Sequence, residues 1–389
     1  MLSFDNTEVA FSGKSNAELN RAYWLFKLIG NPSLVKVGKQ LTNVALSLHL
    51  PIGWVIKPTI FKQFCGGETI EECKGTIVRL GQFNIGTILD YSIEGKEDEA
   101  TFDATCQEII RTIEAAAKDP KNIPFSVFKL SGLATVSLLE AINTDLQNLG
   151  ASEQKSYLDF HRRVEAICKK AFERGVRIFI DAEESWLQDG IDRIATEMMV
   201  KYNRTQPIVY NTVQMYRHDR LEFLKKAVAE AKHEGYFYGV KLVRGAYMEK
   251  ERARAAKQNY PSPIQPNKAA SDRDFNAALE FCVENHEHVA LCAGTHNEDS
   301  SKLLAALIEK KGISHNDPHF FFAQLLGMSD HISYNLAHEG YNVAKYVPYG
   351  PVREVVPYLI RRAEENTSVK GQTGRELGLI IKEKQRRKG

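Results

Sequence analysis

The sequence lacks the features that mark several common classes of protein. It has only six cysteines in 389 residues, and none of them forms a C-x-x-C pair. This excludes a disulfide-rich scaffold, so reduced thiols in the cytosol are expected. Net charge is also small, because 51 Lys and Arg are balanced by 49 Asp and Glu to give +2. Bulk charge therefore gives no reason to expect nucleic-acid binding, and any cationic binding site must be local.

Neither a targeting segment nor a membrane-spanning segment is expected from the pattern. The chain begins with acidic and polar side chains where a signal or transit peptide has cationic and then apolar ones. The longest apolar stretch, residues 41–56, is shorter than the roughly 20 residues of a membrane span and is interrupted by Asn43, His49 and Pro51. We expect a buried helix there, and a cytoplasmic protein.

Motifs for nucleotides and metals are also absent. The 26 glycines include no G-x-G pair, and neither a Rossmann fingerprint nor a P-loop occurs. There is no H-E-x-x-H, and His315 and His319 are separated by Asp317-Pro318, which will not hold a helical ligand pair. No metal site is expected. A flavin or nicotinamide, if one binds, needs another kind of fold.

What the chain does contain is a regular alternation of short apolar runs and helical segments. Residues 1–80 have helical spacing, with helices predicted over 16–28 and 33–48. Eight short apolar or aromatic runs follow, each with a charged helical stretch behind it. Eight such units predict a closed parallel barrel, with an open doubly wound sheet as the alternative. The runs are residues 83–92, 125–133, 176–183, 208–216, 238–247, 289–297, 319–327 and 342–350.

The ends of these runs favour the barrel. Seven of the eight finish in polar, aromatic or glycine-rich residues, and active sites of parallel barrels are built from the carboxyl ends of several strands. A Rossmann sheet would concentrate its signature at one or two turns. The sequence therefore predicts an α/β protein with a distorted (βα)8 TIM-like barrel over residues 81–370. A helical extension (1–80) precedes the barrel, and a basic tail (371–389) follows it.

Two charged residues near the ends of the second and third runs are site candidates. Asp181 ends an apolar strand, so its carboxylate belongs at the barrel mouth unless it caps the next helix. Lys129 interrupts an apolar run, so it either points to solvent or faces an anion inside the barrel. Strand alternation places Lys129 on the same face as Val127 and Ser131.

The fifth and sixth runs add further candidates. Lys241 and Arg244 lie close together at one strand end, which indicates an anionic ligand or, alternatively, surface charge at a helix end. Tyr247 would share a face with Lys241 if the strand ran straight. His296, in GTHN, closes the sixth run and is either a ligand contact or a structural histidine.

The sharpest cluster is a helix predicted over residues 357–366. Arg361 and Glu365 are one turn apart, and Arg362 lies about 100° round the axis, so two guanidiniums fan across one side. Adjacent arginines braced in this way suit bidentate capture of a carboxylate. The alternative is an ordinary solvated helix face.

Together these segments carry a family resemblance. YLIRRAEEN (358–366) resembles the C-terminal helix motif of the proline dehydrogenases. FKLSGL, DAEE, NTVQMY, VKLVRGAY, GTHN, FAQLLGM and KYVPYG resemble that family's strand-end motifs in the same order, from about residue 89 to 369. The form KLVRGAY is similar to the eukaryotic-type, monofunctional branch. The resemblance implies a barrel that holds FAD non-covalently and oxidises L-proline to Δ1-pyrroline-5-carboxylate, with hydride passing from proline C5 to flavin N5.

The resemblance also implies roles for individual residues at the substrate. Arg361 and Arg362 would bind the substrate carboxylate, with Lys129 as a third cation. Asp181 would keep the arginines and Tyr346 oriented. A tyrosine at position 346 implies proline rather than hydroxyproline, because the phenol fills the space that a 4-hydroxyl needs. The residues expected to line the pocket around the proline ring are Tyr247, Leu325 and Tyr346.

Other implied roles concern a gate and the cofactor. Glu94 resembles the acidic partner of Arg361 in a gate over bound substrate. The VKLVRGAY motif leaves open which of Lys241 and Arg244 approaches the flavin. The positions that match FAD contacts or supports are Ala182, Gln214, Lys241, Arg244, Gly245, Ala246, Thr295, His296 and Glu365.

The expected partners follow from the same resemblance. The electron acceptor is expected to be a membrane quinone, and the basic tail, IIKEKQRRKG, is either a solvated terminus or a peripheral contact with the inner membrane face. A separate pyrroline-5-carboxylate dehydrogenase would take the product. Two alternatives remain: a flavin barrel like methylenetetrahydrofolate reductase, and a barrel without activity that binds membrane or RNA.

Overall fold

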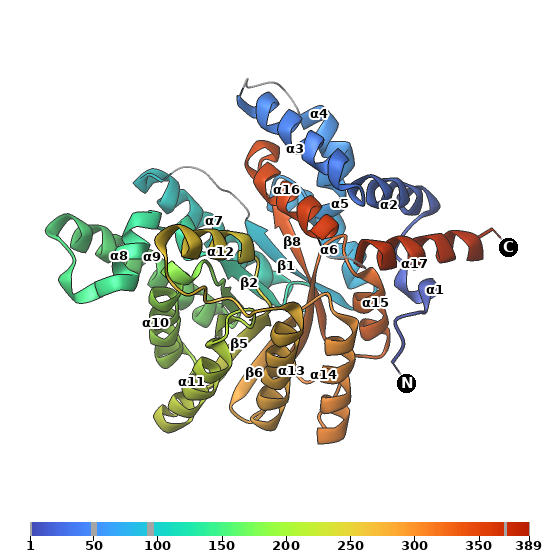
Figure 1. Cartoon of the computed structure of the whole chain (residues 1–389). Coiled ribbons are helices and arrows are strands. Elements are labelled where there is room, and N and C mark those ends of the chain that lie inside the picture. The colour runs from blue at the N-terminus through green and yellow to red at the C-terminus, as the bar shows by residue number, and fades with distance from the viewer. Residues whose placement is uncertain (1, 48–52, 92–96, 369–371, 389) are drawn as a thin grey trace. The chain divides into compact units, whose positions relative to one another are not determined.

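Eight parallel strands form the centre of the fold. In the computed structural model, which describes residues 2–47, 53–91, 97–368 and 372–388, the strands follow one another in chain order around a closed barrel (Figure 1). Each predicted run contains one strand, so the (βα)8 prediction is confirmed and the doubly wound alternative is wrong. The strands are β1 (Ile85–Tyr91), β2 (Phe125–Phe128), β3 (Arg177–Ile180), β4 (Val209–Gln214), β5 (Tyr238–Val243), β6 (Val289–Gly294), β7 (Phe320–Leu325) and β8 (Val343–Tyr349).

The helices between and after the strands begin and end at residues suited to those positions. Asn267 and Asn297 accept backbone hydrogen bonds as N-caps, and Gly175, Gly235 and Gly312 end helices in the left-handed conformation that glycine adopts most easily. These helices are α7 (Glu99–Lys118), α8 (Val136–Asp145), α9 (Ala151–Arg174), α10 (Ser185–Tyr202), α11 (Arg220–Glu234), α12 (Met248–Gln258), α13 (Lys268–Glu284), α14 (Glu298–Lys311), α15 (Asp330–His338) and α16 (Val352–Ser368), with short 3₁₀ turns at Leu130–Gly132 and Leu146–Asn148.

The described part of residues 1–81 is mainly helical, as predicted. The helix predicted over 16–28 begins with a capping box between Ser15 and Glu18, and the helix predicted over 33–48 is also present. The elements are α1 (Thr7–Ala10), α2 (Asn16–Ile29), α3 (Pro32–Ser47), α4 (Gly53–Ile56), a π-turn η1 (Lys57–Phe61), α5 (Lys62–Phe64) and α6 (Ile70–Gly81).

The apolar stretch at 41–56 differs from the prediction. Its described residues belong to α3, which runs to Ser47, and to α4, which starts at Gly53, while residues 48–52 lie outside the described part. Trp54 on α4 is 77% exposed, so the prediction of a buried helix is wrong there. Among the described helices, none is long and apolar enough to cross a bilayer.

The chain divides into two compact units. A terminal unit contains residues 1–95 and 324–389, and a central unit contains residues 96–323. In the central unit, the rings of Phe125 and Phe179 stack at 4.4 Å, and Tyr210 meets both at 5.4 Å, which fills the space between strands β2 to β4. The predicted domain boundaries at 80 and 370 stay predictions.

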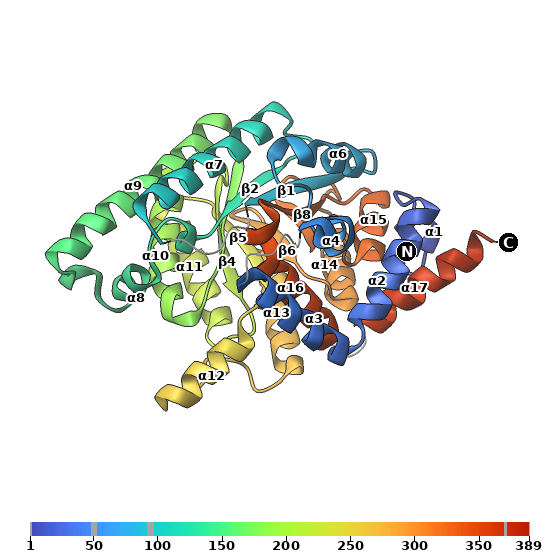
Figure 2. The same cartoon turned by 90° about the horizontal axis from the view of Figure 1, so that it is seen from above.

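The basic tail packs along one face and is solvated along the other. It forms α17 (Gln372–Arg386), which lies beside α1 and α2 in both views (Figures 1 and 2). Leu379 and Ile380 pack into the apolar cluster that these helices share. Arg387 donates to the carbonyl oxygens of Phe11 and Lys14 at 2.8 Å and pairs with buried Glu383 at 2.7 Å. The tail's charge is therefore partly used to hold the N-terminal segment.

Candidate active site

The centre of the candidate site in the central unit is a buried ion pair. Asp181 directly follows β3, where its backbone N–H donates to the Phe128 carbonyl at 2.9 Å. Its carboxylate pairs with the ammonium group of Lys241, which is 4% exposed and lies 5.1 Å from the Phe179 ring centroid. Asp181 is not a helix cap, because the N-cap of α10 is Glu184. The structure thus brings two of the predicted residues together at the carboxyl ends of β3 and β5.

Arg244 is held in a different direction from Lys241. It lies just beyond β5, and its guanidinium donates to Asp272 at 2.7 Å, to Thr295 at 2.8 Å and to Ser300 at 3.0 Å. It also lies over the Phe275 ring at 4.4 Å. Burial alone would raise the pKa of Asp272, but hydrogen bonds from Lys268 and Arg244 outweigh it and lower that pKa. The alternative of loose surface charge is therefore wrong for Arg244.

Strand β4 contributes an unmet hydrogen-bond acceptor. Gln214 ends the strand and is 3% exposed, and its side-chain oxygen finds no hydrogen-bond partner among the residues that the structure describes. The hydroxyl of Thr212, two residues earlier on the same face, is also buried without a partner, and Thr212 is in register with Lys241 on β5. A buried acceptor left unpaired costs about 1–3 kcal/mol. A ligand that donates a hydrogen bond to it would remove this cost.

The second strand ends earlier than alternation assumed. Because β2 stops at Phe128 and Ser131 lies in the following 3₁₀ turn, Ser131 does not share a strand face with Val127, and the prediction is wrong for Ser131. Lys129 itself keeps an extended backbone. The backbone N–H of Ser131 instead donates to the Glu183 carboxylate at 2.9 Å. Burial raises the pKa of Glu183, although Ser131 and Lys129 oppose the rise. Lys129 is half-buried just before the following 3₁₀ turn.

The turn after β5 has a backbone that only glycine fits well. Gly245 has a φ of 137°, and a Cβ there would lie 2.4 Å from the Tyr216 ring. Gly245 and Ala246 are exposed, and Tyr247 sits at the N-cap position of α12. Since β5 stops at Val243, the strand does not run on to Tyr247, and the condition under which Tyr247 would share a face with Lys241 is not met.

Three further predicted cofactor positions follow β3 and β6. Ala182 is buried next to Asp181, and Thr295 is buried, with its hydroxyl accepting from Arg244 and from the Asn297 backbone at 3.1 Å. His296 follows Thr295 and is half-buried. Within the described residues, no group of three or more His, Cys, Asp or Glu is suited to hold a metal ion.

The terminal unit carries the other predicted residues. Leu325 ends β7, and the N–H of the next residue, Leu326, donates to the Tyr346 carbonyl on β8 at 2.8 Å. Tyr346 is 8% exposed. Glu94 lies outside the described residues, and Glu365 lies on α16 one turn after Arg361, with its side chain outside the described part.

The two arginines lie on α16, the predicted helix. Arg361 is half-buried, and Arg362 is buried with its guanidinium 5.0 Å from the Tyr358 ring centroid. Val355 and Leu359 are buried in an apolar cluster. An ordinary solvated face is therefore wrong for Arg362.

One buried charge network was missed by the sequence analysis. Lys345, next to Tyr346 on β8, is fully buried and pairs with Asp330 at 2.8 Å, and Asp330 also pairs with Lys14 at 2.7 Å. Burial acts to raise the pKa of Asp330, but Lys14 and Lys345 outweigh it and hold that pKa well below the usual range. A lysine inside an apolar strand was the signal used for Lys129, and the same signal would have found Lys345.

The cysteines agree with the expected reduced state. All six are free and buried. Burial raises the pKa of Cys73 and of Cys292 to about 12, so neither thiol is ionised near neutral pH.

A closed parallel barrel with buried charges at its strand ends defines the class of (βα)8 enzymes. The family model for proline dehydrogenase matches residues 73–375. The chain belongs to the proline dehydrogenase family and is an oxidoreductase. This membership decides against the reductase-like barrel and the barrel without activity.

Several relatives are similar over most of the chain. "Proline dehydrogenase 1, mitochondrial" of Dictyostelium discoideum is 33% identical over 98% of this chain and 74% of its own length. "Hydroxyproline dehydrogenase" of Xenopus laevis is 30% identical over 99% of this chain and 90% of its own length. The proline dehydrogenase of Caenorhabditis elegans is 36% identical over 88% of this chain, which spans 56% of that relative.

A solved structure shows the same fold. The crystal structure of proline utilization A from Bdellovibrio bacteriovorus superposes with a TM-score of 0.72 at 21% identity, covering 94% of this chain. The chain spans only 36% of that much longer protein. At this identity the likeness concerns the fold.

The central unit has groups that fit a flavin cofactor. The buried Gln214 oxygen needs a donor, and an oxidised flavin ring carries one N–H. The exposed backbone of Gly245 has no Cβ to obstruct a ligand, and Arg244 is a rigid cation beside it. The residues that could hold FAD on these grounds are Gln214, Lys241, Arg244, Gly245 and Thr295.

Proposed function

We propose that the protein oxidises L-proline to Δ1-pyrroline-5-carboxylate with bound FAD. The flavin, when bound, supplies the acceptor for the hydride that leaves proline C5. The observation that carries this proposal is the buried Gln214 oxygen, which has no partner among the described residues, on the strand that pairs with the strand of Lys241, whose ammonium group is paired with Asp181. Family membership supplies the substrate class, and these residues supply the polar end of the site.

The roles proposed at the substrate rest on charge and shape. Proline is a zwitterion, so its carboxylate needs cations, and we assign this to Arg361 and Arg362 with help from Lys129. The apolar ring needs walls that exclude water, which we assign to Tyr247, Leu325 and Tyr346. Asp181 orients the cations, and Glu94 closes the site together with Arg361.

We assign different roles at the cofactor to Lys241, which lies on β5, and to Arg244, which directly follows this strand. The buried Lys241 ammonium group lies 5.1 Å from the Phe179 ring centroid. The Arg244 guanidinium is held instead by hydrogen bonds to Asp272, Thr295 and Ser300. We assign Lys241 to the reactive part of the flavin, where a cation stabilises charge on the reduced ring. Arg244 anchors the rest of the cofactor. The remaining assignments are Ala182, Gln214, Gly245, Ala246, Thr295, His296 and Glu365.

The central experiment is anaerobic reduction of the purified protein by its substrate. The protein should be yellow, and adding L-proline without oxygen should bleach the flavin absorbance. A variant with Arg361→Met and Arg362→Met should keep its flavin and remain oxidised, because only the carboxylate contacts are removed. Oxidised flavin that persists with L-proline, or reduction by NADH instead, would contradict the proposal.

Replacing Tyr346 tests which substrate is preferred. Tyr346→Ser should lower kcat/KM for L-proline about 10-fold and raise the relative rate with 4-hydroxyproline, because the ring wall is lost and space for a hydroxyl opens. The measurement is steady-state oxidation of both compounds. An unchanged ratio of the two kcat/KM values would argue against this role.

The electron acceptor is proposed to be a membrane quinone, and the N-terminal helices are the proposed contact with the bilayer. Among the described residues, five large apolar side chains on α2, α3 and α4 are at least 50% exposed, and Lys27 lies 5.0 Å from the Trp24 ring centroid. Exposed tryptophan with neighbouring lysine suits an anionic lipid surface. The five are Trp24 and Leu28 on α2, Leu34 and Val37 on α3, and Trp54 on α4.

Vesicle binding checks this contact. Trp54→Ser should reduce sedimentation with vesicles of mixed neutral and anionic phospholipid several-fold, because the largely exposed indole can no longer insert. Leu158→Ser is the matched control, because Leu158 is 67% exposed but lies on α9. Equal loss in both variants, or no sedimentation of the unmodified protein, would count against the N-terminal contact.

The fate of the product is a further part of the proposal. Pyrroline-5-carboxylate is released to a separate dehydrogenase. The cytoplasmic location expected from the sequence stays a prediction, since several relatives are named mitochondrial.

A further inference from the structure

The terminal unit contains a charged cavity that the proposed reaction does not use. Its volume is about 380 Å³, and its walls come from α2, η1, α5, α6 and the segment between β7 and α15. Phe61, Leu80 and Leu326 give it apolar sides, and Thr76 adds a hydroxyl. A cavity of this size is in the range that holds small organic ligands.

Cations outnumber carboxylates in this cavity. Each carboxylate has a cationic partner: Asp330 pairs with Lys14 at 2.7 Å, Glu18 with Arg79 at 3.1 Å, and Glu72 with Lys57 at 3.9 Å. The lining cations are Lys14, Arg21, Lys57, Lys62 and Arg79, and the lining carboxylates are Glu18, Glu72 and Asp330.

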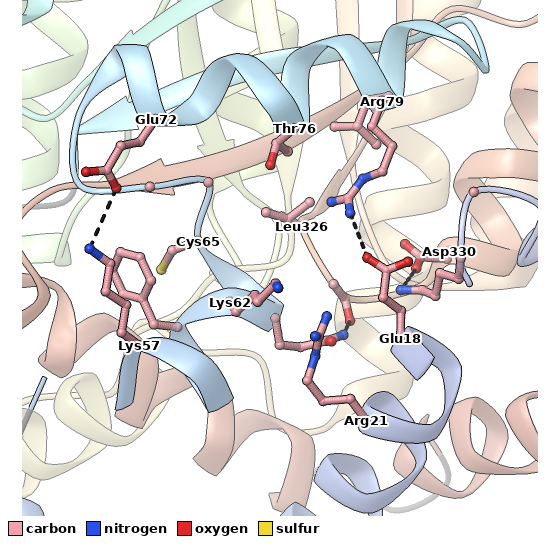
Figure 3. A pocket seen from close by; sticks show the side chains of 18 of the residues that line it. Glu18, Arg21, Lys57, Lys62, Cys65, Glu72, Thr76, Arg79, Leu326 and Asp330 are labelled. Carbon is pink, nitrogen blue, oxygen red and sulfur yellow. Dashed lines mark hydrogen bonds and ion pairs between the residues drawn. The ribbon is translucent and has the colours of Figure 1, made fainter. Parts of the chain in front are cut away.

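Two cations remain without a carboxylate. Within the described residues, neither Arg21 nor Lys62 forms an ion pair, and the Arg21 Nε is buried with no hydrogen-bond partner. Figure 3 shows both side chains pointing toward the middle of the cavity, between the three ion pairs. Two unpaired like charges repel each other, and a buried N–H without an acceptor costs about 1–3 kcal/mol. A bound dianion would remove both costs.

We infer that this cavity binds a small organic dianion, either a dicarboxylate or a phosphate ester, through Arg21 and Lys62. The guanidinium offers paired N–H donors to a carboxylate or phosphate, and the ammonium group takes the second charge. The apolar walls accommodate a short carbon skeleton. The ligand would contact Leu326, whose neighbour Leu325 is assigned to the substrate pocket. The inference stands on the terminal unit alone and does not depend on the proposed function.

Calorimetric titration of the flavin-loaded full chain tests the site. The probes are succinate and glycerol 2-phosphate, with acetate as the monoanion, all at matched ionic strength. One dianion should bind saturably with a stoichiometry of one, and acetate should not. Whichever probe binds identifies the dianion as a dicarboxylate or as a phosphate ester. The titrations are repeated with the Arg361→Met variant. Because this variant lacks one of the arginines proposed to bind the substrate carboxylate, a probe bound at the proposed substrate site does not contribute to the signal.

Variants locate the binding. Arg21→Gln and Lys62→Gln should each weaken the dianion about 10- to 100-fold, the loss of one charge-assisted hydrogen bond. Lys62 is exposed, so Lys62→Gln keeps the test decisive if Arg21→Gln does not fold. Lys74→Gln, an exposed lysine on α6 outside the cavity, should bind like the unmodified chain. Absence of saturable binding, or equal weakening by Lys74→Gln, would overturn the inference.

Discussion

Asp330→Asn is expected to lower the free energy of unfolding by about 3–5 kcal/mol, the cost of breaking a buried ion pair by removing one partner. Lys345 is fully buried on β8, and its ammonium group donates to the Met328 carbonyl at 2.5 Å and pairs with Asp330 at 2.8 Å. Burial lowers the pKa of Lys345, and Asp330 opposes that change. Without the carboxylate, a buried charge is left uncompensated. Urea unfolding at neutral pH measures the loss.

Matched variants show whether the loss comes from the unpaired charge. Adding Lys345→Met to Asp330→Asn should recover part of the stability, because the uncompensated ammonium group is removed. Glu222→Gln, which breaks an exposed pair with Lys225, should cost well under about 1 kcal/mol. If the double variant is no more stable than Asp330→Asn, another cause is responsible.

The same pair predicts a dependence on pH. Because the pKa of Asp330 is lowered in the folded protein, its contribution is full above the ordinary value of 3.8 and is lost as the pH falls toward the lowered value. Each pH unit below 3.8 should remove about 1.4 kcal/mol of that contribution. The stability difference between the unmodified chain and Asp330→Asn should therefore shrink in acid.

Lys241→Met is expected to slow flavin reduction by L-proline on the order of 100- to 1000-fold, the usual cost of removing one preorganised charge at a reacting centre. In the central unit, Lys241 is buried and paired with Asp181 at the carboxyl ends of the strands. Anaerobic stopped-flow measurement of flavin absorbance checks the rate. The flavin should also bind sulfite more weakly, because that adduct places negative charge on the ring.

A comparison with Arg244 separates the two cations. Arg244→Gln should lose flavin on gel filtration, since Arg244 links Asp272, Thr295 and Ser300, whereas Lys241→Met should retain it. Lys241→Arg should restore part of the rate and of the sulfite affinity, because charge is kept. If Lys241→Met loses flavin and Arg244→Gln only slows reduction, the two roles are exchanged.

The barrel was predictable because a parallel strand covered on both faces is apolar along its length. All eight runs became strands for this reason, and the helix with Arg361 and Arg362 followed from its 3.6-residue period. The points where β2 and β5 stop were not predictable. A strand ends where hydrogen bonds to its neighbour end, and this depends on the register with another segment. On this account Ser131 does not share the predicted strand face, and β5 does not run on to Tyr247.

The sequence by itself therefore determined the family, the eight-strand barrel and most of the residues at its strand ends, because local pattern and motif order carry that information. Only the tertiary structure decided that Lys241 joins Asp181 while Arg244 joins Asp272, and that Arg387 of the tail holds the carbonyls of Phe11 and Lys14. The partner of a charged side chain depends on which groups lie near it in space. Lys241 and Asp181 are 60 positions apart and Arg387 and Phe11 are 376 apart, so each pair forms only after folding. The cavity with Arg21 and Lys62 likewise forms only when segments that are distant in the sequence come together.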